Sequence, residues 1–189
     1  SERGIPIVRR GEMLRRIMEG RSGIAICGTH GKTTTTAMTA AALRGSGIDA
    51  SLVLGGIDVV TKTNAHHGSA PWFLTEADES DGSFALLEPS IAVVTNIEND
   101  HLSSDAELPK LVASFDEFLA KLPEDGTAIV GVDNPQSRSI AGSKRSAKTV
   151  TFGIAGDAQI RAENIRFADL GSSFDVIAGD VCLGTAELR

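Results

Sequence analysis

Residues 25–36 of the chain read AICGTHGKTTTT. This stretch places two glycines, a lysine and four consecutive threonines directly behind a short apolar run. Glycine costs backbone entropy on folding, and β-branched threonines are mediocre helix formers, so the stretch has little packing value. We infer that something other than stability keeps these residues together.

The residues around this stretch predict a strand, a tight turn and a helix. Residues 23–28 form an apolar run bounded by glycines, which is typical of a buried strand. Residues 32–44 are expected to be helical and to end near Gly45. Because the first N–H groups of a helix lack partners within the helix, they attract an anion. The unit therefore predicts a phosphate site, with a plain tight turn as the alternative.

The predicted phosphate site consists of Gly28, Thr29, His30, Gly31, Lys32, Thr33 and Thr34. Gly28 and Gly31 would let the backbone wrap closely around phosphate oxygens, Lys32 would supply a positive charge, and the Thr33 hydroxyl could bind Mg²⁺. The threonines that follow can donate hydrogen bonds to carbonyls within the helix. The match to G-x-x-x-x-G-K-[ST] is imperfect, because Ile26 occupies the place of the first glycine.

Two acidic segments follow predicted buried strands. TEADESDGS (75–83) contains more carboxylates than one Mg²⁺ ion needs, so most of them must have another role. TNIENDHLSSD (95–105) contains His101 beside acidic residues, where a metal ligand, a general base and a helix cap all remain open. Both segments are expected at the carboxyl edge of the sheet, where ligands usually bind in α/β folds.

The rest of the chain predicts an α/β fold with a mostly parallel sheet and helices on both faces, like a P-loop NTPase. Further strands are predicted at 50–56, 71–78, 90–96, 126–133 and 148–153, and helices at 9–20 and 107–122. Residues 131–137 are assigned to a strand-to-helix turn. The segments 159–167, 172–178 and 180–188 alternate apolar and polar residues, which predicts a small antiparallel ribbon at the C-terminal end.

Composition excludes several classes of protein. The chain has 189 residues, 18 basic and 25 acidic, and a net charge of −7, which disfavours nucleic-acid binding. No apolar run is long enough to span a membrane, and no signal-peptide pattern appears. Cys27 and Cys182 lie far apart and predict no disulfide framework or metal site. We therefore expect a cytoplasmic protein with reduced cysteines.

Three motifs in this order, GTHGKTTTT, EADESDGSF and TNIENDH, resemble the central ATPase domain of the Mur ligases. The resemblance runs from about residue 5 to residue 189. His30 in the loop and the motif EADESD resemble the corresponding motifs of the family members that join L-alanine to UDP-N-acetylmuramate. The resemblance implies ATP as cofactor with Mg²⁺, for which Mn²⁺ could substitute. It also implies an acyl-phosphate intermediate and the release of ADP and phosphate.

The resemblance also assigns catalytic roles. Lys32 would neutralise the transferring phosphoryl group, and Thr33 with Glu76 would hold one Mg²⁺ ion. His101 would reach a second metal near the acyl phosphate, and an imidazole ligand suits Mn²⁺ better than Mg²⁺.

Three further residues are implied to bind the muramyl substrate. Asn64 lies in a segment that matches the family's Asn-Ala-x-x-Gly loop. Ser80 and Ser83 could donate hydrogen bonds to the sugar-lactoyl part, with helix capping as the alternative.

The family pattern divides the chain into three parts. Residues 1–22 would be an interdomain linker and entry helix, residues 23–153 the ATP-binding core, and residues 154–189 the ribbon of the same domain. The family's UDP-binding N-terminal domain, its C-terminal domain and its adenine-contacting helix have no counterpart in the chain. We therefore expect weak nucleotide binding and no ligase turnover from the isolated chain.

Three alternatives remain. A related ligase that recycles murein peptide onto UDP-N-acetylmuramate has a similar loop, and only the amino-acid-binding domain would separate the two. A non-catalytic nucleotide-binding switch is disfavoured because Ile97 occupies the lysine position of the guanine-reading Asn-Lys-x-Asp pattern. The isolated chain could also be a folded scaffold that binds nothing measurable.

Overall fold

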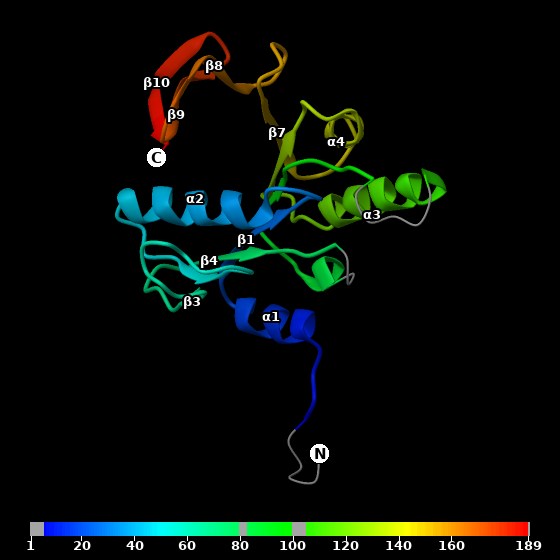
Figure 1. Ribbon diagram of the computed structural model, residues 1–189. Helices are drawn as coiled ribbons and strands as arrows, with labels where there is room; N and C mark the ends of the chain where they lie inside the picture. The colour runs from blue at the N-terminus through cyan, green and yellow to red at the C-terminus, as the bar shows by residue number, and fades with distance from the viewer. Residues whose placement is uncertain (1–5, 80–82, 100–104, 189) are drawn as a thin grey trace.

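The computed structural model describes residues 6–79, 83–99 and 105–188 (Figure 1). The helices are α1 (Arg10–Met18), α2 (Lys32–Gly45), α3 (Leu108–Ala120) and α4 (Pro135–Ala141), with 3-10 turns η1 (Ser83–Leu86) and η2 (Asp105–Glu107). The first strands are β1 (Ser22–Cys27), β2 (Ser51–Val53), β3 (Ala65–His66), β4 (Trp72–Glu76) and β5 (Ile91–Val94). The later strands are β6 (Thr127–Gly131), β7 (Lys148–Gly153), β8 (Ile160–Ala168), β9 (Gly171–Ala178) and β10 (Val181–Leu188).

The ten strands form one sheet in the order β10-β9-β8-β7-β6-β5-β1-β4-β2-β3. Every pairing from β8 to β2 along this order is parallel. The pairings at the two ends, β8 with β9, β9 with β10 and β2 with β3, are antiparallel. The prediction of a mostly parallel sheet with a C-terminal antiparallel ribbon is confirmed.

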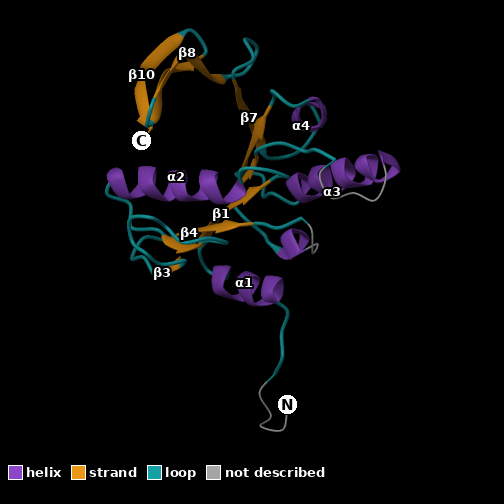
Figure 2. Ribbon diagram, viewed as in Figure 1, coloured by secondary structure: helices purple, strands orange, loops and turns teal. Residues whose placement is uncertain are grey.

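Helices cover both faces of the parallel part, as predicted (Figure 2). On one face, α2 packs through Ala40 and Leu43 on a cluster that includes Ile26 and Leu74. On the other face, α1, α3 and α4 share one larger core. The fully buried centre of that core is Phe115 with its α3 neighbours Phe118 and Leu119. Apolar side chains therefore project from both faces of β1 and β4 into the two cores, which explains why the sequences of these strands are continuous apolar runs.

Four strands, β2, β4, β5 and β6, are shorter than the predicted segments 50–56, 71–78, 90–96 and 126–133. Residues 50–56 form a strand only over β2, because Leu54 donates its N–H to the Asn64 carbonyl and Gly55 turns toward β4. The short β3, which pairs with β2, was not predicted. Residues 90–96 form a strand only over β5, because Thr95 and Asn96 leave the ladder and bond to the loop before α2.

The segment 131–137 is the strand-to-helix turn that the sequence predicts, and it leads into α4. Asn134 is the N-cap, and its side-chain oxygen accepts hydrogen bonds from the N–H groups of Gln136 and Ser137. Pro135 occupies the first turn, where its missing N–H has no cost. None of the described helices has the length and apolar character that a membrane span requires.

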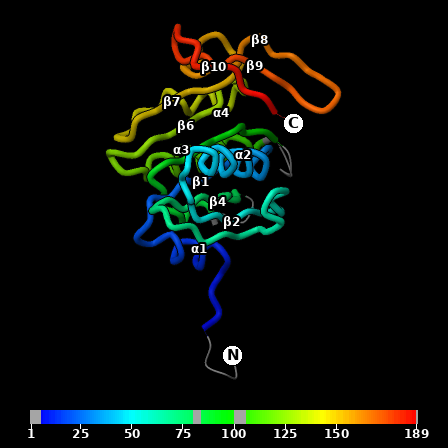
Figure 3. Tube along the Cα trace, turned by 90° about the vertical axis from the view of Figure 1, so that its left-hand side faces the viewer, coloured from blue at the N-terminus to red at the C-terminus, as the bar shows by residue number. Residues whose placement is uncertain are grey.

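The ribbon of β8, β9 and β10 stands at one end of the sheet, far from α1 at the other end (Figure 3). It joins the core through a short pairing, in which Phe152 and Gly153 of β7 meet Ile160 and Arg161 of β8. Within the core, β1 lies between β4 and β5. The carboxyl ends of these three strands therefore lie side by side, and the segments that follow them meet.

Candidate functional site

The loop between β1 and α2 owes its shape to two glycines with positive φ, Gly28 at 133° and Gly31 at 81°. A Cβ atom on Gly28 would lie 2.1 Å from the Thr95 hydroxyl oxygen, so the loop requires glycine there. Thr35 is the first residue to return a backbone bond, to the Gly31 carbonyl at 2.9 Å. The N–H groups before it lie at the end of α2 that carries partial positive charge.

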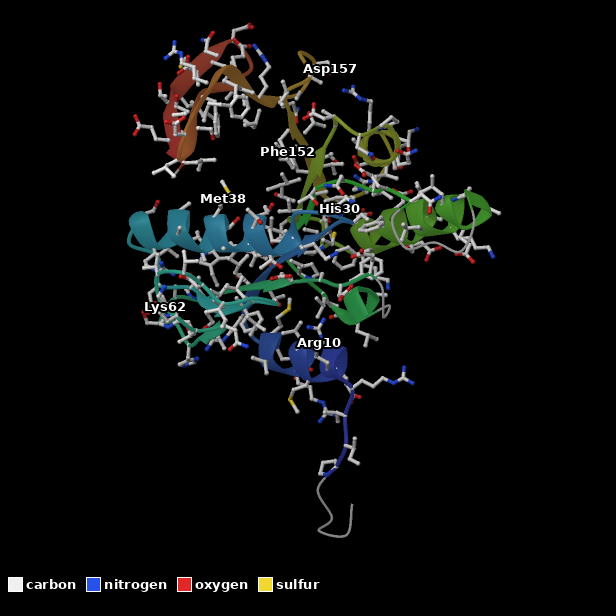
Figure 4. The ribbon with its side chains drawn as sticks, in the orientation of Figure 1. Arg10, His30, Met38, Lys62, Phe152 and Asp157 are labelled. Carbon is white, nitrogen blue, oxygen red and sulfur yellow. The ribbon has the colours of Figure 1, made fainter. Side chains whose placement is uncertain are left out.

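The residues after β5 hold this loop in place. The Thr29 N–H donates to the Asn96 carbonyl at 3.0 Å, and the His30 N–H donates to the Asn96 side-chain oxygen at 2.9 Å. The Thr95 hydroxyl donates to the His30 carbonyl at 2.7 Å. His30 itself lies where β1 passes into α2 (Figure 4). Two neutral residues that directly follow β5 thus fix the loop before α2.

Thr33 and Glu76 lie together, although they are 43 positions apart in the sequence. The Thr33 hydroxyl, in the first turn of α2, donates to one Glu76 carboxylate oxygen at 2.9 Å. The other oxygen accepts the Gly55 N–H at 2.7 Å, at the point where the chain leaves β2. Glu76 ends β4, so the end of this strand and the start of α2 present one hydroxyl and one anchored carboxylate to the same space.

Lys32 pairs with Glu79, a residue that the sequence analysis left without a role. Its Nζ atom lies 3.1 and 3.0 Å from the two Glu79 carboxylate oxygens and donates to the Gly28 carbonyl at 2.7 Å. Both side chains are mostly buried, with exposed fractions of 18% and 12%. Burial raises the pKa of the neighbouring Cys27 thiol, the Glu79 charge raises it further and the Lys32 charge lowers it. Cys27 is therefore a neutral core residue.

The donor set fits a hard divalent cation that keeps other ligands. Within the described residues, no group of three His, Cys, Asp or Glu side chains gathers as a metal centre. Thr33 and Glu76 instead offer one hydroxyl and one carboxylate. Mg²⁺ commonly uses one or two protein carboxylates and completes its shell with water and phosphate oxygens. These two residues could hold Mg²⁺ together with a bound phosphate.

The threonine run has the expected local hydrogen bonds. The hydroxyl of the buried Thr36 donates to the Lys32 carbonyl at 2.8 Å, as predicted. Thr39 repeats the pattern one turn later, with the Thr35 carbonyl as acceptor at 2.8 Å. For the buried Thr36, this bond satisfies a hydroxyl that would otherwise lack a partner.

The family model of the Mur ligase middle domain matches residues 26–183. The chain belongs to this family.

Two curated relatives of the chain are both UDP-N-acetylmuramate–L-alanine ligases. The UDP-N-acetylmuramate–L-alanine ligase of Rhizorhabdus wittichii is 43% identical over 93% of this chain, and that of Paracoccus denitrificans is 39% identical over 98%. The chain spans 37% and 39% of the length of these two proteins. The match is therefore with one part of each relative.

Solved Mur ligase structures share the fold. The UDP-N-acetylmuramate:L-alanyl-γ-D-glutamyl-meso-diaminopimelate ligase of Neisseria meningitidis superposes with a TM-score of 0.83 at 23% identity, covering 97% of this chain and 60% of its own. The UDP-N-acetylmuramate–alanine ligase of Thermotoga maritima gives 0.76 at 24% identity, covering 94% of this chain and 39% of its own. At these identities the likeness concerns the fold alone.

The structure of this Mur ligase domain brings Lys32, Thr33 and Glu76 together. His101 and Ser80 lie outside the described residues. Ser83 begins η1, and Asn64 is exposed, with its carbonyl bonded to the Leu54 N–H at 2.8 Å.

Sequence reasoning missed three residues of the site, Glu79, Thr95 and Asn96. Glu79 was one of several carboxylates in an acidic segment, and no pattern separated it from the others. Thr95 and Asn96 carry a weak signal, since short polar side chains directly after a buried strand can bond to neighbouring backbone. Their partner, the loop before α2, is known only once β5 is seen beside β1.

Proposed function

We propose that this chain is the ATP-binding domain of a ligase that joins L-alanine to UDP-N-acetylmuramate. The observation that carries the proposal is the hydrogen bond between Thr33, which follows Lys32 in the first turn of α2, and Glu76 at the end of β4. The curated relatives at 39–43% identity favour L-alanine over a recycled murein peptide as the second substrate. Because ATP and nucleotide-linked sugars are supplied inside the cell, the proposed reaction belongs to the cytoplasm.

In the proposed reaction, the γ-phosphoryl group of ATP moves to the carboxylate of UDP-N-acetylmuramate, and the amine of L-alanine displaces phosphate from the resulting acyl phosphate. The N–H groups at the start of α2 would bind the phosphates, and Lys32 would neutralise charge on the transferring group. Thr33 and Glu76 would hold Mg²⁺, which stabilises the negative charge of the phosphoryl oxygens. His101 remains the proposed ligand of a second metal, with Mn²⁺ as an accepted ion.

The same proposal assigns the muramyl substrate to the neighbouring loops. Asn64, Ser80 and Ser83 are the proposed contacts. A groove of about 250 Å³ lies between α1 and the ends of β2 and β4, and Glu76 and Gly55 form part of its wall. The groove supports an approach of the carboxylate substrate toward Glu76 from the α1 side.

Calorimetry of ADP and a non-hydrolysable ATP analogue with Mg²⁺ tests the nucleotide site. We expect Lys32→Ala to weaken binding by about tenfold or more, because a buried charge-assisted contact is lost. Lys110→Ala, which removes an exposed lysine on α3, is the matched control and is expected to bind like the wild type.

Equal binding by both variants would contradict the proposed role of Lys32. Tighter binding of GDP than of ADP would favour the nucleotide-switch alternative. For the ligase itself, a longer protein that carries this domain should release phosphate with L-alanine and not with murein peptide.

A further inference from the structure

Lys32 already holds an anion in this structure. Both Glu79 carboxylate oxygens lie 3.0–3.1 Å from its Nζ atom, and the Gly28 carbonyl accepts a third bond at 2.7 Å. The Thr29 carbonyl lies farther away, at 3.4 Å. An ammonium group has three N–H donors. These contacts account for all three donors, so a phosphate oxygen can bind Lys32 only by displacing or sharing one of them.

The displaced partner would be Glu79 and not Gly28. The Gly28 carbonyl belongs to a backbone that Thr95 and Asn96 hold in place, whereas the Glu79 contact comes from the end of a flexible side chain. A carboxylate with an exposed fraction of 12% would also repel an arriving phosphate across a short, poorly screened distance. Both arguments predict that Glu79 and phosphate cannot occupy the Lys32 ammonium together.

The two glutamates at the end of β4 differ in how they are held. Glu76 is fixed by two hydrogen bonds, from the Gly55 N–H and the Thr33 hydroxyl. Glu79 is held by Lys32. The backbone between them is anchored by the Ala77 N–H on the Ile26 carbonyl at 2.8 Å. Glu79 can therefore leave Lys32 by side-chain rotation, while the backbone and Glu76 stay in place.

We propose that Glu79 is an internal anion that occupies the Lys32 phosphate position and is expelled when a di- or triphosphate binds. The proposal rests on the proposed ATP site and adds a regulatory contact to it. Without nucleotide, Glu79 neutralises a buried lysine and keeps the loop ordered. When nucleotide binds, the competition from Glu79 lowers the affinity of the loop and Lys32 for the phosphates. The lower affinity favours release of the diphosphate product.

Inorganic pyrophosphate without added metal is the probe that isolates this contact. Binding would be measured by calorimetry and by the rise in thermal midpoint, for the wild type, Glu79→Gln and Glu79→Ala. We expect both variants to bind pyrophosphate about tenfold more tightly than the wild type, because a competing charge-assisted contact is gone. Glu88→Gln, at an exposed position away from the loop, is the matched control and should leave the affinity unchanged.

A second background assigns the effect to Lys32. In Lys32→Ala, adding Glu79→Gln should give a much smaller gain than in the wild type, since only the repulsion between carboxylate and phosphate is relieved and no ammonium remains for which the two anions compete. A gain as large as in the wild type would overturn the proposal, because Glu79 would then act by charge repulsion alone. Equal or weaker pyrophosphate binding by Glu79→Gln would overturn it as well, since Glu79 would then belong to the binding site itself.

The outcomes separate the two proposals. Should the wild type bind Mg-ADP in a Lys32-dependent way while Glu79→Gln gains nothing for pyrophosphate, the internal anion fails and the ATP site stands. Should the wild type and the Glu79 variants bind neither probe, both proposals fail together.

Discussion

At the residue scale, the site depends on positions where a single added side-chain atom would force the backbone to move. Gly28 has a φ of 133°, a conformation that side chains rarely adopt, and it lies against the Thr95 hydroxyl. That contact lets Thr95 bond to the His30 carbonyl and fix the loop. The glycine is therefore a packing requirement of the loop, in addition to its proposed contact with phosphate.

The first prediction at this scale compares two glycines. We expect Gly28→Ala to lower the free energy of unfolding by about 2 kcal/mol or more, because the strained φ and the clash with Thr95 add. Gly45→Ala, at the end of α2 with open space around it, should be neutral or stabilising by up to about 1 kcal/mol. Urea unfolding followed by circular dichroism measures both. A Gly28→Ala protein as stable as the wild type would show that the loop relaxes freely.

At the element scale, the local sequence pattern predicted the strands and helices well, but it did not predict which strands pair. The run of residues 23–36 contains its own strand, turn and helix signals, and β1, the loop and α2 follow them closely. The contact of Lys32 with Glu79 joins residues 47 positions apart. It depends on β4 lying beside β1, which no local signal specifies. Sequence therefore predicted the edge of the sheet where the acids gather, and the structure was needed to assign each acid a partner.

The N-cap of α4 gives the prediction at the element scale. The Asn134 side-chain oxygen accepts from Gln136 and Ser137, and α4 is too short to lose these bonds without cost. We expect Asn134→Ala to destabilise the protein by about 1–2 kcal/mol. Asn134→Asp should stay within about 0.5 kcal/mol, because a carboxylate accepts the same bonds and suits the helix dipole. Equal losses in both variants, measured by urea unfolding, would mean that the amide NH₂ group matters and the cap does not.

At the scale of the whole molecule, the sheet has a buried parallel core and an exposed ribbon. Met38 on α2 lies on the side of the helix that faces the ribbon (Figure 4). The ribbon carries highly exposed apolar side chains, among them Phe167 and Leu170, with exposed fractions of 86% and 89%. Ile177 of β9, by contrast, is buried at 9% exposure. In the part of the chain that the structure describes, the ribbon joins the core's ladder of hydrogen bonds through the short pairing of β7 with β8.

This contrast predicts where the ribbon contributes stability. We expect Phe167→Ser combined with Leu170→Ser to change the free energy of unfolding by less than about 0.5 kcal/mol, because both side chains are in water already. Ile177→Ala should cost about 2 kcal/mol through lost burial. The single tryptophan, Trp72 on β4, reports unfolding of the core by fluorescence, and circular dichroism reports the ribbon as well.

A large loss from the double serine variant would contradict the exposed ribbon in solution. If the free energy of unfolding of the wild type then also rose with protein concentration, Phe167 and Leu170 would be covered by a second copy of the chain. If it did not depend on concentration, the ribbon would fold back on its own core. Coincident fluorescence and circular dichroism transitions in the Ile177→Ala protein would show that the short β7–β8 pairing suffices to couple ribbon and core. Separate transitions would make the ribbon an independent folding unit that begins near residue 154.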